Sequence, residues 1–238
     1  HRADGMVEMA KGAKQAGALN WAGMGDEEEL DRILGTGAET IKIVKPYENR
    51  EMVYRKLRHA YEAGAFAVGM DIDHSFGGNG RPDNVVGFQM APVSQEELKG
   101  FVKATPLPFI VKGVLSVQDA LKCRDCGVSG IVVSHHHGIM PYAVPPLMAL
   151  PKIVEAAGKD MDVFVDCGVA TGADTYKVLA MGAKAVCVGR AVLPSLRDDG
   201  AEGVRAYIEG MNDELRGIMA RTASRDLASI DPGTLWKV

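Results

Sequence analysis

Residues 108–136 read PFIVKGVLSVQDALKCRDCGVSGIVVSHH and contain a complete strand–helix–strand unit. The apolar, β-branched run from Pro108 to Val114 predicts a buried strand. Ser116 then opens a helical segment, and Gly127 stands where that segment is expected to end. A second apolar run, Gly130 to His136, predicts the next strand. Because both strands are short and almost wholly apolar, we expect them to be parallel and covered by helices.

The same alternation of a short apolar run and a longer amphipathic segment continues along all 238 residues. Helical segments open with N-terminal signals, such as the acidic run after Asp26 and the capping-box spacing from Ser94 to Glu97. No linker or low-complexity tract interrupts the pattern, so residues 1–238 are interpreted as a single domain. The predicted strands are Ala18–Gly23, Thr40–Lys45, Phe66–Asp73, Pro108–Val114, Gly130–His136, Val163–Val169 and Ala185–Arg190.

An open doubly wound sheet and a closed (β/α)8 barrel both fit this alternation. Chemically active residues follow nearly every predicted strand, whereas an open sheet would concentrate them at one crevice. A barrel uses the carboxyl ends of many strands at once, so the fold class is predicted to be an α/β (β/α)8 TIM barrel. The residues at these strand ends are Lys45, Asp71, Asp73, Lys112, Ser134 to His137, Asp166, Gly168, Gly189 and Arg190.

A barrel needs eight strands, and this chain supplies seven. The chain starts with His1 rather than Met, and a helical stretch from about Gly5 to Ala16 precedes the first predicted strand. We therefore expect that an N-terminal segment carrying the first barrel strand is missing. The prediction is a gap between the strands that begin at Ala18 and Ala185.

The composition excludes several classes of protein. Lys and Arg number 27 against 31 Asp and Glu, and they are scattered, which disfavours a nucleic-acid partner. Apolar stretches are too short for a membrane span, and the first residues do not resemble a signal peptide. Four cysteines do not make a disulfide scaffold, and Cys123 and Cys126 lack the second pair that a zinc site needs. A cytoplasmic enzyme with a small-molecule substrate fits best, and a homo-oligomer is compatible with this interpretation.

Two glycine-containing loops after the last strands give the best phosphate signal. They are Asp166–Gly172 and Val188–Arg190. Glycine lets backbone N–H groups approach phosphate oxygens, and a following helix N-terminus adds positive potential. Arg190 would add a forked, charge-assisted contact.

Lys112 lies in an otherwise apolar strand. Burying a charge there costs free energy unless the charge has a partner, so Lys112 is expected to have a functional role. Two roles remain open: a Schiff-base lysine, or a fixed cation beside a cofactor that becomes anionic.

Three consecutive histidines, His135 to His137, end another strand. Adjacent strand residues point to opposite faces, which predicts His136 on one side and its two neighbours on the other. A general base built from one histidine, a metal site and an unreactive polar loop are all compatible with this motif.

Asp71 and Asp73 are two residues apart, which predicts that both carboxylates face the same side. One of them could orient and polarise a catalytic histidine. A zinc site is also conceivable, in which Asp71, Asp73 or His74 joins the three consecutive histidines. The loop Gly77–Arg81 follows and could bring Arg81 over the site.

From Pro106 to Leu227 the sequence resembles the FMN-dependent α-hydroxy acid oxidases and dehydrogenases, such as glycolate and lactate oxidases. The matching segments include a lysine strand, a Ser-x-His motif and two phosphate-end segments. In this chain they are Lys112 to Ala120, Ile131 to His136, Asp166 to Asp174 and Gly182 to Arg190. The N-terminal half is weaker but collinear, with Asp71 to Asp73 on the family's Thr-Val-Asp.

The resemblance implies FMN as cofactor, no metal, and a role for each matched residue. It implies that His136 is the base, that Asp73 is paired with it, and that Lys112 stabilises the reduced anionic flavin. Arg81 falls on the family's loop arginine. The implied cofactor contacts are Lys112, Ser134, Asp71, Asp166, Gly168, Gly189 and Arg190, and the implied substrate contacts are Lys45 and Arg81.

Three positions depart from the family pattern. Ile139 replaces the active-site arginine that follows the histidine, Lys45 replaces a tyrosine, and Ala170 replaces a phosphate-loop arginine. The usual fork for a substrate carboxylate is therefore lost. The leading hypothesis is an FMN-dependent oxidoreductase acting on a CH–OH group. The alternatives are a flavin-dependent isomerase of the same fold, a lyase using Lys112 or a metal held by His135, His137 and Asp71, and a non-catalytic paralogue.

Overall fold

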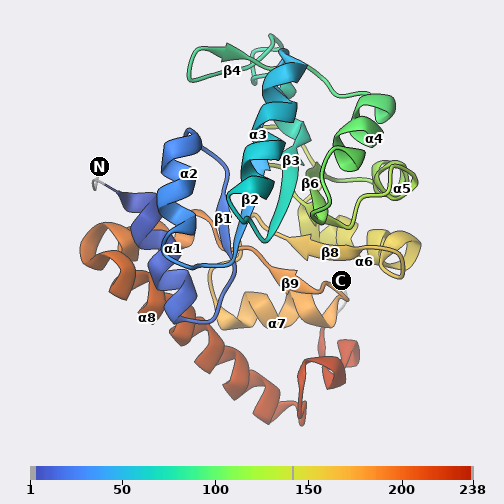
Figure 1. Ribbon diagram of the computed structural model, residues 1–238. Helices are drawn as coiled ribbons and strands as arrows, with labels where there is room; N and C mark the ends of the chain where they lie inside the picture. Colours follow the sequence, from blue (N-terminus) through green and yellow to red (C-terminus); the bar gives the residue numbers. More distant parts are fainter. Residues whose placement is uncertain (1–3, 141, 237–238) are drawn as a thin grey trace.

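The computed structural model describes residues 4–140 and 142–236. Seven parallel strands form one curled sheet in the order β1-β2-β3-β6-β7-β8-β9 (Figure 1). Their bounds are β1 Asn20–Ala22, β2 Thr40–Val44, β3 Ala67–Asp71, β6 Phe109–Val114, β7 Gly130–Val133, β8 Asp162–Val165 and β9 Ala185–Val186. All seven predicted strands are confirmed. Most are shorter than predicted, because the polar residues after them turn into loops.

Helices alternate with the strands and cover the outside of the sheet (Figure 1). Their bounds are α1 Gly5–Gln15, α2 Glu27–Leu34, α3 Arg50–Glu62, α4 Gln95–Lys103, α5 Val117–Asp125, α6 Pro146–Ala157, α7 Gly172–Ala180 and α8 Leu193–Arg221. The short 3-10 helices are η1 Ile72–Ser75, η2 Arg190–Val192, η3 Leu227–Ser229 and η4 Pro232–Thr234. A small antiparallel hairpin, β4 Asn84–Val85 with β5 Phe88–Gln89, projects from the loop after β3.

The sheet has the curvature of a TIM barrel but is open on one side. Among the described residues, β1 pairs with β2 alone and β9 with β8 alone, so these two strands are the ends of the sheet. The predicted seven-strand barrel with its opening between the first and last strands is therefore confirmed.

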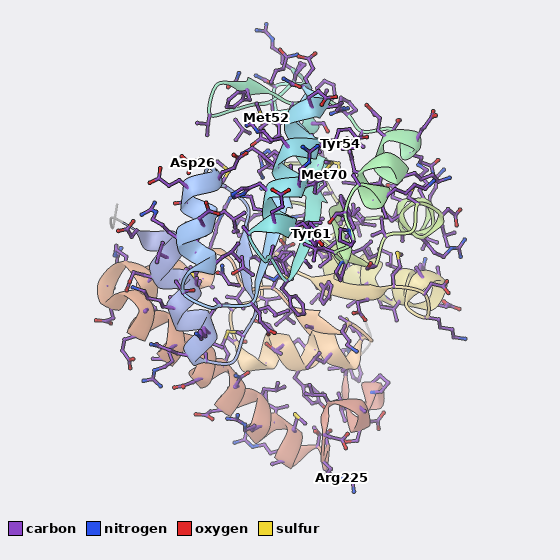
Figure 2. All side chains as sticks on the ribbon, viewed as in Figure 1. Asp26, Met52, Tyr54, Tyr61, Met70 and Arg225 are labelled. Atoms are coloured by element: carbon purple, nitrogen blue, oxygen red, sulfur yellow. The ribbon has the colours of Figure 1, made fainter. Side chains whose placement is uncertain are left out.

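Two apolar layers hold the barrel together. Inward-facing side chains form a small core inside the sheet, and their outward neighbours form the larger core beneath the helices. On β2 and β3, for example, Ile43 faces the interior whereas Met70 lies fully buried in the outer layer. Tyr54 of α3 packs edge-to-face on Phe101 in the same layer, and Figure 2 shows Tyr54 and Met70 on neighbouring elements.

The helix starts follow the sequence signals. Asp26 accepts the Glu29 amide at the start of α2, and Ser94 with Glu97 closes a complete capping box at α4. Gly12 lets α1 lie directly on α8, since a Cβ there would meet the Ala201 carbonyl at 2.4 Å. No helix in the described residues is long and apolar enough to cross a membrane.

Candidate active site

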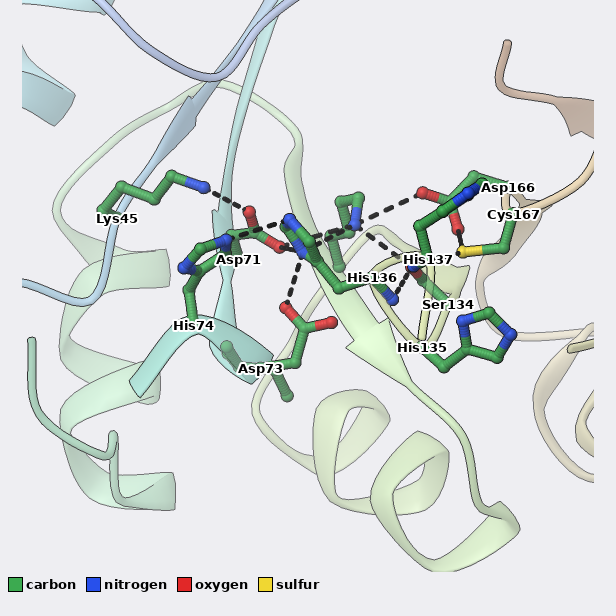
Figure 3. Close-up of polar contacts among 12 residues, drawn as sticks. Lys45, Asp71, Asp73, His74, Ser134, His135, His136, His137, Asp166 and Cys167 are labelled. Carbon is green, nitrogen blue, oxygen red and sulfur yellow. Dashed lines mark hydrogen bonds and ion pairs between the residues drawn. The ribbon is translucent and has the colours of Figure 1, made fainter. Parts of the chain in front are cut away.

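Polar side chains from several strands meet at the carboxyl ends of the sheet, where a barrel places its chemistry (Figure 3). They form one connected group of ion pairs and hydrogen bonds. Its members are Lys45, Asp71, Asp73, His74, Asp83, Lys112, Ser134, His136, Asp166 and Cys167.

Asp73 reaches this group from a tight turn. Asp71 and Asp73 were predicted to share one face of a strand. The strand is too short for this, because β3 ends at Asp71 and residues Ile72–Ser75 form η1. Both carboxylates nevertheless face His136. The approach of Asp73 depends on Gly113, whose backbone has φ +101° and where a Cβ would lie 2.7 Å from the Asp73 Cγ.

His136 lies at the centre of the group. Strand alternation does not explain its direction, because β7 ends at Val133 and His136 has a left-handed backbone with φ +50°. Its Nδ1 lies 3.3 Å from Asp73 Oδ1 and 3.4 Å from Asp71 Oδ1. Hydrogen bonds to Asp71 and Asp73 outweigh burial and raise the pKa of His136 to about 9.

The two other histidines of the motif do not join this group. His135 accepts the Gly138 amide through Nδ1 at 2.9 Å, which closes a local turn. His137 is exposed, and its backbone N–H donates to Cys167 Sγ at 3.2 Å. Of the three imidazoles, only that of His136 joins the connected group, although His137 also lines the pocket beside it.

Lys112 connects the two halves of the site. Its ammonium lies 3.1 Å from Ser134 Oγ, 3.3 Å from Asp166 Oδ2 and 3.4 Å from His136 Nδ1. Burial opposes its charge, but Asp71 and Asp166 more than compensate and raise the pKa of Lys112 above 10.5. Lys112 is therefore charged at neutral pH, which suits a fixed cation and disfavours a Schiff-base nucleophile.

Lys45 and Asp71 form a buried ion pair at 2.5 Å. Burial of Asp71 favours its neutral form, but the bond from His136 and the charges of Lys112 and Lys45 lower its pKa well below the ordinary range. Lys45 is thus paired with Asp71, a carboxylate of the protein itself, rather than directed at a substrate carboxylate. Asp71 in turn is 2% exposed and lies beneath the site rather than at its surface.

A pocket of about 490 Å³ opens beside this group, at the ends of β8 and β9. Both predicted phosphate loops line it. A side chain added at Gly168 or Gly189 would meet none of the described residues within 4 Å, so open space lies beside both glycines. The pocket-lining residues are Lys112, His136, His137, Asp166, Cys167, Gly168, Val169, Ala170, Cys187, Gly189, Arg190 and Ala191.

These features fit the phosphate end and ring of a flavin nucleotide. Arg190 is exposed at the pocket and forms no ion pair with any described residue, which leaves its guanidinium for an anion. The N-terminus of α7, however, does not offer free backbone N–H groups to a phosphate as expected. Asp174 already accepts the Ala170 and Thr171 amides, and Glu214 accepts the Gly172 amide at 2.8 Å.

Arg81 is the predicted residue that the structure does not bring to the site. Its side chain is exposed on the loop between η1 and β4, and it is not among the pocket-lining residues. The backbone N–H of Arg81 donates to the Asn79 side chain, which shapes the loop.

Three further side chains lie here: the sequence assigned no role to Asp83 and Cys167, and it gave His74 only a place in a conceivable zinc site. His74 Nε2 lies 2.9 Å from His136 Nε2, and His74 Nδ1 lies 2.8 Å from Asp83 Oδ2. Cys167 donates to Asp166 Oδ1 at 2.9 Å. His74 could have been found from the sequence as a site residue, because it directly follows Asp73. Asp83 reaches His74 only through the fold of the intervening loop.

A family model described as FMN-dependent dehydrogenase matches residues 89–237. That match covers more than half of the chain, and it includes the lysine strand, the histidine motif and both phosphate loops. The protein therefore belongs to the FMN-dependent dehydrogenase family, whose cofactor is FMN.

Similar proteins are hydroxy acid oxidases. Glycolate oxidase 3 of Arabidopsis thaliana is 29% identical over 95% of this chain and 72% of its own length. L-lactate oxidase of Roseobacter sp. (strain GAI101) is 37% identical over 63% of this chain, and the match spans 40% of that protein. A solved structure of mandelate oxidase with (S)-2-phenylpropionate has a TM-score of 0.87 at 28% identity, covering 95% of this chain and 72% of that chain.

Proposed function

We propose that the protein is an FMN-dependent oxidoreductase that acts on the CH–OH group of a small α-hydroxy acid or a related hydroxy compound. The observation that carries this proposal is the His136–Asp73 pair, 3.3 Å apart, at a pocket that also contains Lys112 and two phosphate-type loops. FMN supplies the electron-accepting chemistry when it is bound. The chain supplies the base, the fixed charges and the shape of the pocket.

His136 takes the hydroxyl proton of the substrate. Its Nδ1 faces Asp71 and Asp73, so the imidazolium that forms is stabilised by two carboxylates. The neutral imidazole is the active form, and proton abstraction is therefore expected to accelerate as pH rises toward the His136 pKa of about 9.

Lys112 places a permanent positive charge in the pocket, where it would stabilise negative charge on a reduced cofactor. Ser134 holds that ammonium from the floor of the site, because its buried hydroxyl accepts from Lys112 Nζ at 3.1 Å. Gly168, Gly189 and Arg190 would hold the phosphate at the loops after β8 and β9.

Among the described residues, no arginine is placed in the pocket to bind a substrate carboxylate through two hydrogen bonds, apart from Arg190 at the phosphate loops. Ile139 stands at the family's arginine position, Lys45 is committed to Asp71, and Arg81 is exposed on its loop. Arg81 remains our proposed substrate contact through movement of that loop. We expect simple α-hydroxy acids such as glycolate and lactate to bind weakly.

The test measures FMN binding and turnover separately. Purified protein is titrated with FMN by flavin fluorescence, and flavin bleaching is followed under anaerobic conditions with a panel of α-hydroxy acids. We expect His136→Ala to bind FMN like the wild type and to lose the bleaching rate by at least about 100-fold. His135→Ala is the matched control, since His135 contacts only the local turn.

Two results would contradict the proposal. One is the failure of FMN to bind although the protein is folded. The other is a bleaching rate in His136→Ala that equals that of the wild type. A flavin that binds but is bleached by no hydroxy acid would favour the isomerase alternative.

A further inference from the structure

We propose that His74, His136 and Asp71 form a binding site for a divalent transition metal of the zinc class, with Asp83 orienting His74. One nitrogen from each imidazole and one Asp71 oxygen lie within 4.8 Å of one another. The histidine motif left open a zinc site with Asp71, Asp73 or His74, but its spacing did not identify the ligands. The histidine that completes it comes from the turn after β3, far from the histidine motif in sequence.

The two imidazoles face each other through nitrogen atoms. His74 Nε2 and His136 Nε2 are 2.9 Å apart, with the rings at 81° to each other. Two nitrogens bound to one tetrahedral zinc ion at about 2.0–2.1 Å lie about 3.3 Å apart, so the two rings would have to separate by about 0.4 Å to admit the ion. Imidazole nitrogen is a preferred ligand of zinc, copper and nickel.

Asp83 sets the state of His74. Its Oδ2 lies 2.8 Å from His74 Nδ1, which places the proton of a neutral imidazole on Nδ1 and leaves the Nε2 lone pair facing His136. A carboxylate that accepts from the distal nitrogen of a ligating histidine is the usual outer partner of protein metal sites.

Asp71 supplies an independent observation. Its side chain is buried, with 2% exposed, and Oδ1 makes only long contacts, 3.4 Å to His136 Nδ1 and 3.5 Å to Lys112 Nζ. Lys45 neutralises the other oxygen at 2.5 Å. Oδ1 is thus a buried carboxylate oxygen beside His136 that no short hydrogen bond occupies among the described residues, and a metal ion could take it as a ligand.

The local charge also suits a divalent cation. Four carboxylates lie in the connected group against two ammonium groups, so two negative charges remain when the metal has displaced the proton of His136. A divalent ion would balance them. The carboxylates are Asp71, Asp73, Asp83 and Asp166, and the ammonium groups are Lys45 and Lys112.

Zinc binding is tested on the untagged full chain after dialysis against a chelator. Zn²⁺ is titrated in competition with a chromophoric chelator, and Co²⁺ is titrated for its visible ligand-field bands. We expect one equivalent of each ion to bind. His74→Ala should weaken Zn²⁺ binding by at least about 100-fold, and Asp83→Asn by about 10–100-fold. His135→Ala is the matched control and should bind like the wild type.

Each variant is checked for folding by circular dichroism. If His74→Ala does not fold, Asp83→Asn decides the question, because Asp83 is partly exposed at the edge of the site. Absence of stoichiometric binding, undiminished binding in His74→Ala or Asp83→Asn, or loss of binding in His135→Ala would each overturn the proposal.

One consequence rests on the proposed function: His136 cannot bind a metal and accept a substrate proton with the same lone pair. Zn²⁺ should then inhibit flavin bleaching, and a chelator should restore it. The metal titration needs neither FMN nor substrate, so failure of the metal site and failure of the proposed function give different results.

Discussion

At the scale of single residues, the protonation of His136 depends on two neighbouring carboxylates and one neighbouring lysine. Asp73 and Asp71 raise the histidine pKa, while the charge of Lys112 opposes them. The same carboxylates keep Lys112 charged. Removing either carboxylate would therefore change the titration of His136 as well as its orientation.

The raised pKa makes a prediction about stability. The pKa of His136 rises from 6.5 to about 9 in the folded protein, so its protonation stabilises the fold fully below about pH 6.5. That contribution, about 3 kcal/mol, is lost as pH rises through 9. Urea unfolding of the wild type and His136→Ala at pH 6 and pH 9.5 measures it as the difference between the two proteins.

The difference is needed because another group titrates in the same range. Burial is the main cause that lowers the pKa of Lys42 to about 8, and its contribution to stability grows as pH rises above that value. Lys42 is present in both proteins and cancels in the comparison. A pH dependence that is the same in both would show that His136 has an ordinary pKa.

At the scale of elements, two local irregularities deliver the catalytic groups. The 3-10 turn η1 directs Asp73 and His74 inward immediately after β3. In β6, the register with β7 shifts between Lys112 and Val114, and Gly113 there has a positive φ. Such a bulge lets a strand redirect a side chain next to a functional site.

We therefore predict that Gly113→Ala damages both stability and the site. An added Cβ would clash with the Asp73 side chain and sit on a strained backbone, so the free energy of unfolding should fall by about 1–3 kcal/mol. Displacement of Asp73 should also lower the His136 pKa, which NMR titration can follow.

Gly217→Ala is the control for this substitution. Gly217 is exposed on α8, and a Cβ there meets none of the described residues within 4 Å. Alanine should leave stability unchanged or raise it by about 0.5–1 kcal/mol, because it is the better helix former. Equal behaviour of the two alanine variants would argue against the role given to Gly113.

At the scale of the whole molecule, the hydrogen-bonded sheet of the barrel is continuous except at one opening, between β1 and β9. The inner strands pair on both edges, whereas β1 and β9 pair on one edge each among the described residues. The helix before β1 packs against the helix after β9, because α1 lies on α8.

This topology predicts uneven protection of backbone amides in the isolated chain. Amides of β1 and β9 should exchange hydrogen for deuterium at least about tenfold faster than those of β3 and β6, because an edge strand opens without breaking a second ladder. Hydrogen exchange read by mass spectrometry or NMR measures this. Equal protection at both edges would mean that another segment or a second copy pairs with them.

The sequence by itself determined the fold class, the seven strands and most of the site. Apolar β-branched runs specify buried parallel strands wherever they occur, and polar residues at their carboxyl ends must meet at one rim of a barrel. The pattern could therefore place Asp73, Lys112 and His136 at one rim, and the resemblance to the FMN-dependent family implied that they act together. The reasons given for two of them failed, because strand alternation stops where β3 and β7 end, and the turns that follow set their directions.

Only the tertiary structure decided which charged side chains form ion pairs within the protein and which are left for a ligand. Lys45 and Asp71 lie 26 residues apart in sequence, and nothing local shows that they neutralise each other. The contact of His74 with His136 spans 62 residues and depends on the packing of two loops. Distances of this kind follow from how the strands are arranged around the barrel, so residue pattern alone cannot supply them.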